Sequence, residues 1–310
     1  MVKEAAHMSE SKAKKNHIGQ TREDRVFGVA VYTLLTLTGI IVLYPLLYVV
    51  SASVSNSTAV ISGRVWLWPV EPTVIAYKQV FKNPNILSGY MNSIIYAVCG
   101  TLVSLLLSIL AGYGLSRHSF AGKSAMSRLF IFATLFSGGM IPFYIVVRKL
   151  GMINTRWSLI IPNALNVFHI MLMRTYIQGS IPDEMLEAAD IDGCDHFRKL
   201  LLFVVPLSGS IIAVLTLYNV VGQWNSYFNA LMFLSSYDLY PLQIILREVL
   251  IQNTMTIDMI TDISALELKQ GLADILKYAL IVVASAPLII AYPFVQRFFV
   301  KGVMVGSMKG

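Results

Sequence analysis

The sequence predicts an all-α membrane protein with six spanning helices, and three observations lead to this fold class. Hydrophobic residues make up 56% of the 310 residues and charged residues only 13%, with a mean hydropathy of +0.66. A soluble domain ordinarily carries about 25% charged residues. The charges are also segregated, so that long stretches contain none. Those stretches lack the alternation of apolar and polar residues that a membrane β-barrel requires.

Six charge-free stretches are long enough to cross a bilayer. A hydrocarbon core about 30 Å thick needs about 20 apolar residues in a helix, and about 17 suffice. The stretches cover residues 26–63, 83–116, 129–147, 157–173, 200–237 and 278–296. We therefore expect a transmembrane domain over 26–296, with helices at about 27–50, 91–115, 128–147, 157–175, 205–224 and 276–296.

The segments outside the spans, and the glycine and proline residues within them, add detail to this prediction. The polar N-terminal tail, residues 1–25, has little to bury and is expected to be disordered. The first helix is expected to be retained, because a cleaved signal peptide has a shorter apolar core nearer the start. Gly138-Gly139 and Pro142 permit a bend or a close helix contact in the third helix. A long external loop, 225–275, precedes the sixth.

Basic residues predict the orientation. If the N-terminus is cytoplasmic and the spans alternate, fifteen of the twenty-four Lys and Arg residues fall on the cytoplasmic side, including those of a C-terminal tail, 297–310. This asymmetry follows the positive-inside rule. It also explains the net charge of +7. No segment offers the clustered basic face with aromatic platforms of a nucleic-acid partner.

The polar segment 179–207 is expected to form a cytoplasmic loop of two helices. Pro182 suits the first position of a helix, and Asp183 and Glu184 complement the positive end of that helix. Gly193 can adopt the left-handed conformation that ends it. Asp195 can then cap the second helix.

The first of these helices suits a docking role. The small side chains of Ala188 and Ala189 would let a partner approach closely, and Glu187 offers a carboxylate to an Arg or Lys. The same residues also suit an ordinary solvated helix at the membrane surface. Residue chemistry alone leaves both interpretations open.

The loop resembles the EAA loop of ATP-binding-cassette (ABC) importer permeases. The match consists of Glu187-Ala188-Ala189, then Asp192-Gly193, then Pro206-Leu207. Further motifs are similar to the carbohydrate-uptake (maltose-type) family and its LplC-like branch: Leu43-Tyr44-Pro45-Leu46, Trp68-Pro69, Ser137 to Pro142, Trp224-Asn225 and the terminus from Gln296. The likeness covers about residues 25–310, with 251–270 as an insertion and with Cys194 and Ser210 as departures from the usual Ala and Pro.

This resemblance implies the type I ABC importer permease fold and a subunit that forms half of the path for a sugar, expected to be an oligosaccharide, across the bacterial plasma membrane. It implies four kinds of partner: a homologous second permease in a heterodimer, an ATPase dimer, an extracytoplasmic sugar-binding lipoprotein and membrane lipid. The expected ATPase-docking residues are Glu187, Ala188, Ala189, Asp192 and Gly193, with Gly193 as a hinge. No catalytic residue, cofactor or metal is expected on this chain.

Polar and aromatic residues near the spans are candidates for the sugar path, because they can hydrogen-bond to or stack on a saccharide. These residues are Asn92, Tyr96, Asn163, Asn166, Tyr218 and Asn219. Hydrogen bonding between helices is the more frequent use of such groups.

Two other functional classes are less consistent with the sequence. An ion-coupled secondary transporter needs ionisable groups inside its spans. His169 is the candidate relay there, and a hydrogen bond between helices explains it as well. A membrane enzyme would need paired carboxylates, a metal cluster or an activated nucleophile. Gly122-Lys123-Ser124 imitates the end of a phosphate loop, but the required earlier glycine is Arg117.

Overall fold

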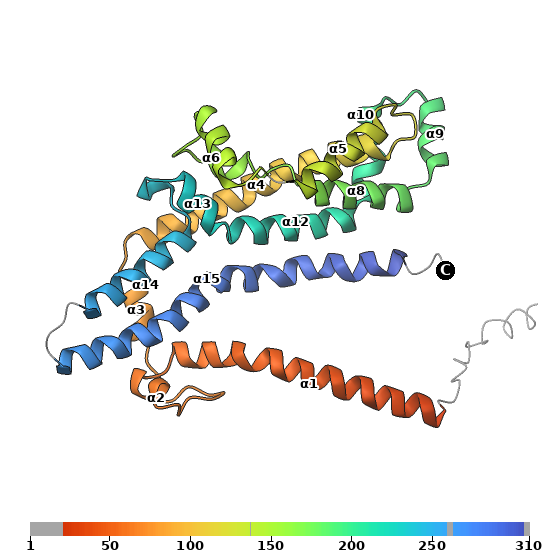
Figure 1. The fold of residues 1–310 in the computed structure, drawn as a ribbon. Coiled ribbons are helices and arrows are strands. Elements are labelled where there is room, and N and C mark those ends of the chain that lie inside the picture. Colours follow the sequence, from red (N-terminus) through yellow and green to blue (C-terminus); the bar gives the residue numbers. More distant parts are fainter. Residues whose placement is uncertain (1–20, 137, 259–262, 307–310) are drawn as a thin grey trace, which may run out of the picture. The chain divides into compact units, whose positions relative to one another are not determined.

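In a computed structural model, the protein consists of helices joined by short connections (Figure 1). The structure describes residues 21–136, 138–258 and 263–306, and no strand occurs among them. The expected disorder of the N-terminal tail concerns mainly residues 1–20, which lie outside the described residues. The chain divides into two compact units between Tyr48 and Val49.

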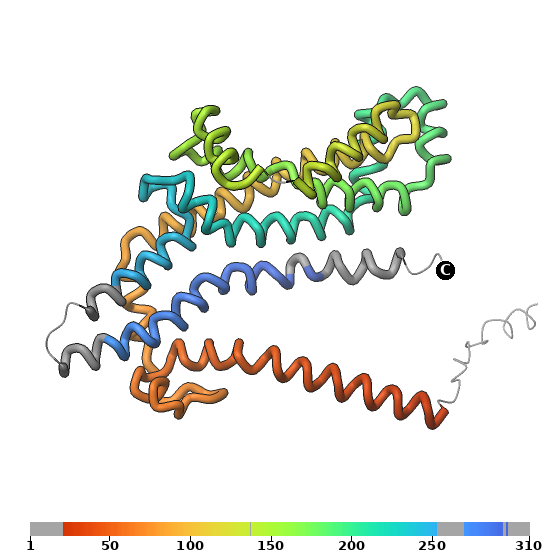
Figure 2. Tube along the Cα trace, viewed as in Figure 1, coloured from red at the N-terminus to blue at the C-terminus, as the bar shows by residue number. Residues whose placement is uncertain are grey.

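The helices follow one another along the trace in Figure 2. In chain order they are α1 (Arg22–Ser53), α2 (Ser57–Ile61), α3 (Ile75–Phe81), α4 (Asn85–Ser116), α5 (Lys123–Leu135), α6 (Met140–Lys149), α7 (Trp157–Ile160), α8 (Val167–Ser180), α9 (Asp183–Ile191), α10 (His196–Lys199), the π-helix η1 (Leu200–Val204), α11 (Val205–Leu207), α12 (Gly209–Trp224), α13 (Tyr227–Phe233), the 3-10 helix η2 (Tyr237–Leu239), α14 (Leu242–Asp258) and α15 (Ile263–Gly306).

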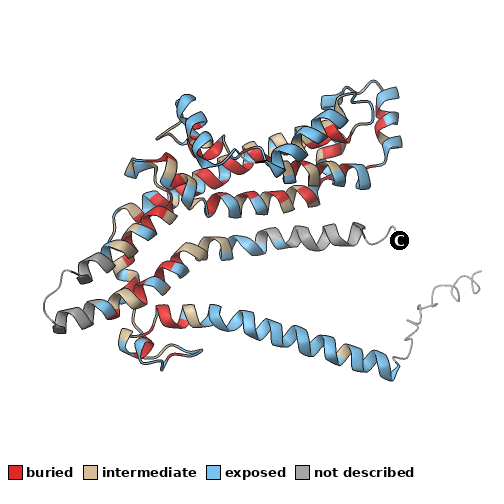
Figure 3. Ribbon diagram, in the orientation of Figure 1, coloured by how far each residue is buried: buried red, intermediate tan, exposed pale blue. Residues whose placement is uncertain are grey.

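Helix α1 makes up the described part of the first unit and continues into the second. It begins at Arg22, because Thr21 and Asp24 cap each other: the Asp24 N–H donates to the Thr21 hydroxyl at 3.2 Å, and the Thr21 N–H donates to the Asp24 carboxylate at 3.0 Å. This is the geometry of a capping box. Its large apolar side chains are exposed along most of its length (Figure 3). Such a surface suits a lipid environment.

Helix α4 is the central helix of the second unit, where it packs against α8, α12 and α14. Glycine permits a close contact between α4 and α8. A Cβ at Gly112 would lie 2.8 Å from the Cβ of Met173 on α8. Because small residues let helix backbones approach closely, Gly112 determines the spacing of α4 and α8.

Two apolar clusters form the core at opposite ends of α4. One contains Tyr113, Met173, Ile177, Ile181, Leu186, Leu200, Val204, Ile211 and Leu215. The other contains Tyr96, Val147, Leu159, Ile160, Ala230, Phe233, Leu234 and Ile244. The first cluster therefore joins α4, α8 and α12 to the expected cytoplasmic loop. The second joins α4 to α6, α7, α13 and α14.

The number of spans differs from the simple expectation of six. Among the described residues, three helices are long and apolar enough to cross a membrane: α1, α4 and residues Gln270–Pro293 of α15. Two bent pairs, α5 with α6 and residues His196–Leu207 with α12, bring the number to five if each pair is one span. Six spans therefore remain a prediction.

Two segments differ from the expected elements. The helix expected over 157–175 is interrupted between α7 and α8, where Pro162 and Asn163 lie. The external loop expected over 225–275 is largely helical in its described part, as α13, η2, α14 and the start of α15. Helix α15 also passes through Pro287 and Pro293 and continues to Gly306, beyond the expected end at 296.

Candidate functional site

The segment 179–207, here called the EAA element, begins with α9. Pro182 is the residue before this helix, with an extended ψ of 136°, and not its first residue as the sequence suggested. Asp183 and Glu184 lie in the first turn, as predicted. Leu186 is 1% exposed and belongs to the core cluster that α4, α8 and α12 share. Packing of one face of α9 thus fixes it to the membrane helices.

The opposite face of α9 is exposed. Glu184, Glu187, Ala188 and Ile191 have the spacing of residues on one helical face. Ile191 is 88% exposed. Ala189, which was expected beside Ala188 at a docking surface, is only 3% exposed and packs against its own chain. One step along a helix turns a side chain by about 100°, so the two alanines face different ways.

The turn after α9 is a Schellman motif centred on Gly193. The Cys194 N–H donates to the Ala189 carbonyl at 2.9 Å, and the Gly193 N–H donates to the Asp190 carbonyl at 3.1 Å. Gly193 has a φ of +74°, which confirms the predicted left-handed conformation. Asp195 then caps α10, because its carboxylate accepts from the Arg198 N–H at 2.7 Å. This cap was also predicted.

Ion pairs hold the EAA element at two points. At the start of α9, the Asp183 carboxylate accepts from Arg117 Nη2 at 2.7 Å. Arg117 follows α4, so this pair ties α9 to the turn between α4 and α5. At the other end of α9, Lys199 Nζ donates to Asp190. That hydrogen bond lowers the pKa of the Asp190 carboxyl below its ordinary value.

The EAA element continues into the membrane helices without a loop. The π-helix η1 and α11 follow α10, and the chain then bends by 81° at Ser208 into α12. π-helices are rare and are frequent at functional sites. At this bend, the Tyr176 and Ser210 hydroxyls lie 2.7 Å apart and connect α8 with α12.

A polar pocket of about 250 Å³ lies between the start of α8 and the end of α12. It is lined by Asn163, Asn166, His169, Tyr218, Asn219, Gly222, Gln223, Ser226 and Asn229. The structure thus brings together four of the six residues considered for a sugar path. Within the pocket, Asn166 caps α8 by accepting from the His169 N–H at 3.3 Å, and Asn219 Nδ2 lies 3.4 Å from His169 Nδ1.

The other two candidates, Asn92 and Tyr96, lie elsewhere. Both are on α4 and are buried, at 3% and 0% exposure. Asn92 Nδ2 donates to the Asp238 carbonyl at 2.7 Å, and the Tyr96 hydroxyl donates to the Leu239 carbonyl at 2.7 Å. These hydrogen bonds anchor η2 to α4, which is the helix-joining alternative that the sequence had left open.

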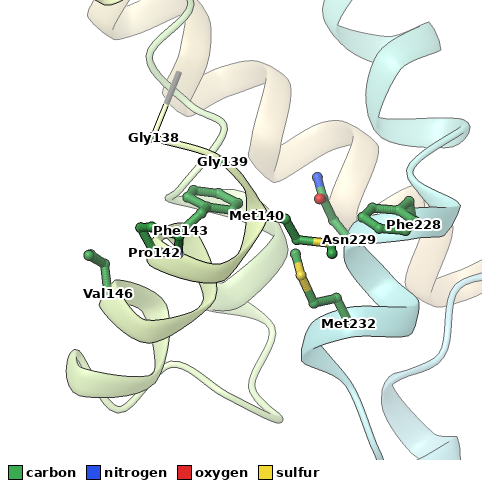
Figure 4. A pocket seen from close by; sticks show the side chains of 9 residues that line it. All are labelled: Gly138, Gly139, Met140, Pro142, Phe143, Val146, Phe228, Asn229 and Met232. Carbon is green, nitrogen blue, oxygen red and sulfur yellow. The ribbon is translucent and has the colours of Figure 1, made fainter. Parts of the chain in front are cut away.

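A second pocket of about 450 Å³ lies between α6 and α13 (Figure 4). Its lining is mostly apolar and consists of Gly138, Gly139, Met140, Pro142, Phe143, Val146, Phe228, Asn229 and Met232. Asn229 also lines the polar pocket, so the two pockets adjoin. The sequence had marked Gly138-Gly139 as a possible bend but had not indicated Phe143, Phe228 or Asn229. The break that these glycines place in an apolar segment marks the α6 side of the pocket, whereas Phe228 and Asn229 on α13 have no comparable local signal.

Comparisons with known proteins agree with this architecture. The chain is 35% identical over 291 residues to the polygalacturonan/rhamnogalacturonan transport system permease protein YtcP of Bacillus subtilis (strain 168), covering 93% of this chain and 100% of that protein. It is 36% identical to the protein LplC of the same organism, covering 94% of this chain and 97% of that protein. The chain belongs to the carbohydrate ABC transporter permeases.

Two further comparisons bear on this family. No family model matches the sequence. The chain is similar to a solved structure, the crystal structure of a bacterial ABC transporter involved in the import of the acidic polysaccharide alginate. One chain of that structure is 33% identical to this one, with a TM-score of 0.78. The match covers 91% of this permease and 99% of that chain. The permease is therefore a multi-pass membrane protein with the ABC importer permease fold.

In this permease, helices α8 and α12 join the EAA element to the polar pocket. Helix α8 carries Asn166 and His169 at its start and leads into α9 at its end. Helix α12 begins at the 81° bend and carries Tyr218 and Asn219 near its end. Trp224, part of the family resemblance, fixes α12 to α15 because its Nε1 donates to the Ala284 carbonyl at 2.9 Å. The EAA element and the polar pocket are thus connected through α8 and α12.

Proposed function

We propose that this permease is a non-catalytic subunit of an ATP-driven importer and forms half of the translocation path for an oligosaccharide. The names of its relatives, which concern polygalacturonan, rhamnogalacturonan and alginate, support a saccharide as the cargo. No group of three His, Cys, Asp or Glu residues within the described ranges could hold a metal ion. The helices and pockets serve to bind, orient and pass the sugar.

The exposed face of α9 carries this proposal. Ile191 is 88% exposed beside the carboxylates of Glu184 and Glu187, on a helix too polar to lie in the bilayer core. Burying such a side chain is worth about 1.5–3 kcal/mol. A partner with an apolar groove and basic residues would bury Ile191 and pair with the two carboxylates. The exposed side chain of Ala188 is small, which lets such a partner approach closely.

The partner that fits this face is an ATP-binding-cassette ATPase dimer in the cytoplasm. This arrangement requires the loop and both termini to be cytoplasmic, as the basic residues predict. The rest of the assembly is a homologous second permease, an extracytoplasmic sugar-binding lipoprotein and the surrounding lipid of a bacterial plasma membrane. ATP-driven closure of the ATPase dimer would displace α9 and, through the shared apolar cluster, α8 and α12.

The two adjoining pockets are the proposed sugar path. Asn163, Asn166 and Asn219 offer amide groups that can exchange hydrogen bonds with sugar hydroxyls. Tyr218 adds an aromatic ring and a hydroxyl. In the second pocket, Phe143 and Phe228 offer apolar surface to the CH face of a sugar ring. Asn92 and Tyr96 are assigned to the scaffold.

The test is co-purification from detergent of the tagged permease with an ATPase subunit and a sister permease. In the same complex, Glu187→Lys is expected to abolish stimulation of ATPase activity by the binding protein and sugar, because it reverses the charge at the docking face. Glu71→Lys is the matched control, since Glu71 is an exposed carboxylate in the segment between α2 and α3. Normal stimulation in Glu187→Lys, or purification without any ATPase, would refute the proposed docking.

A further inference from the structure

Lys199 is a buried cation inside the EAA element. Its side chain is only 2% exposed, although it lies at the end of the short helix α10. Leu200, the next residue, belongs to the apolar cluster that contains Leu186 of α9. The Lys199 ammonium donates to the carboxylate of Asp190, whose side chain is 60% exposed. The pair therefore extends from the apolar cluster to the surface.

The two residues lie on either side of the turn at Gly193. Asp190 is in the last turn of α9 and Lys199 ends α10, so their ion pair links the two helices directly. The Schellman hydrogen bonds and the Asp195 cap already fix the backbone of this turn. A buried ammonium without a partner is strongly unfavourable. Asp190 and Lys199 therefore stay together as long as Lys199 stays buried.

We propose that the Lys199–Asp190 pair clamps α9 to α10, so that both move as one rigid body when the ATPase acts, and that Lys199 is a positioning residue for coupling. This inference rests on the proposed function. It replaces the hinge expected at Gly193, because a turn held by two backbone hydrogen bonds, a cap and an ion pair does not bend there. The bending point lies further along the chain, at η1 and the 81° bend at Ser208.

The clamp predicts an effect on coupling that is separate from stability. Replacing a buried ion pair by apolar side chains is often neutral or stabilising. Lys199→Met keeps an unbranched side chain that is one heavy atom shorter, and it leaves Asp190 in contact with water. The variant is therefore expected to fold, assemble and keep its melting temperature. It loses only the link between α9 and α10.

The experiment measures movement at the pocket without needing to know the cargo. A single reporter thiol is introduced as Asn163→Cys, with Cys99→Ser and Cys194→Ser, in the permease assembled with its ATPase and sister subunit. The probe is N-ethylmaleimide, and its labelling rate is compared with and without ATP and vanadate. Lys199→Met is expected to reduce the nucleotide-dependent change in rate by about fivefold or more, in the range of typical coupling effects.

Controls separate loss of the clamp from a general loss of stability or assembly. Asp274→Asn breaks the exposed pair between Lys277 and Asp274 on α15 and is expected to change nothing. The exchanged pair, Lys199→Asp with Asp190→Lys, restores opposite charges and is expected to recover much of the response. If Lys199→Met does not assemble, the double variant Lys199→Met with Asp190→Asn removes both charges and gives the same test. An unchanged response in Lys199→Met, or in the double variant where Lys199→Met does not assemble, overturns the clamp. Failure of the unsubstituted permease to bind any ATPase overturns the proposed function instead.

Discussion

At the residue scale, a position can require glycine because its φ is positive or because a Cβ would clash, and Gly193 meets only the first condition. Its φ is +74°, but a Cβ placed on it would meet no atom within 4 Å. Backbone conformation alone therefore penalises a substitution. A left-handed conformation costs an L-residue roughly 1–2 kcal/mol, whereas Asn tolerates it. The site consequently offers a clean comparison of side chains.

We predict that Gly193→Val lowers the melting temperature of the purified complex and impairs transport, while Gly193→Asn changes both only slightly. β-branched side chains are least compatible with a positive φ. The measurements are thermal unfolding in detergent and uptake by reconstituted vesicles. Equal behaviour of the Val and Asn variants would mean that the turn does not need its left-handed residue.

Residues with a local signal were predictable, and residues defined by tertiary contacts were not. The turn at Gly193 and the cap at Asp195 follow from short-range chemistry and are confirmed. Lys199 looked like one of several basic loop residues, because burial depends on what packs over it. Asn229 gave no signal for a similar reason, since its pocket forms only when α6 meets α13.

At the element scale, α9 has one face for its own chain and one for a partner. Ala188 is exposed and Ala189 is buried, although the family motif treats them as a pair. Enlarging each side chain therefore has opposite consequences. Ala189→Leu would overpack a buried position, at a cost of about 1–3 kcal/mol. Ala188→Leu would place its added carbons on the exposed face of α9.

We predict that Ala189→Leu destabilises the isolated permease, whereas Ala188→Leu leaves its melting temperature unchanged and weakens ATPase binding. The first readout is thermal unfolding of the permease in detergent. The second is the amount of ATPase subunit that co-purifies at a fixed expression level. If Ala188→Leu retains a full complement of ATPase, the outward face of α9 is not the docking surface.

Several expected helices differ from the observed ones, because hydropathy indicates which residues are apolar enough for a bilayer and does not indicate where a helix begins or ends. The break between α7 and α8 falls in an apolar stretch, where a hydropathy average overlooks Pro162 and Asn163. In contrast, polar residues after Asp262 were interpreted as loop, although a helix can continue outside the bilayer, as α15 does. Charge segregation located the apolar segments well but located the helix ends poorly.

At the scale of the whole molecule, the second unit has two apolar clusters, and α4 contributes residues to both. One cluster includes Leu186 and Leu200 of the EAA element. The pockets lie toward the other cluster, where Phe233 packs against Phe143 and Tyr144. Helices α8 and α12 carry residues of the first cluster and also line the polar pocket, so motion of the EAA element can alter that pocket.

This architecture predicts that some asparagines bind the transported sugar and that others stabilise the fold. Asn163 lines the polar pocket and is exposed, and its side chain has no hydrogen-bond partner in the described part of the chain. Asn163→Ala is expected to leave the melting temperature unchanged. Because a sugar hydroxyl would lose one hydrogen bond worth about 0.5–1.5 kcal/mol, the KM for uptake is expected to rise by about two- to tenfold.

Asn92 is the matched control for this prediction. Its amide donates to the carbonyls of Asp238 and Tyr240 at 2.7 and 3.1 Å, and its oxygen accepts from Arg156 at 3.2 Å. Asn92→Ala leaves buried groups unpaired, at about 1–3 kcal/mol each, so it is expected to lower the melting temperature instead. Uptake is measured with the sugar that best stimulates the ATPase in a panel of neutral and uronate oligosaccharides. An unchanged KM in Asn163→Ala would contradict a role for this amide in the sugar path.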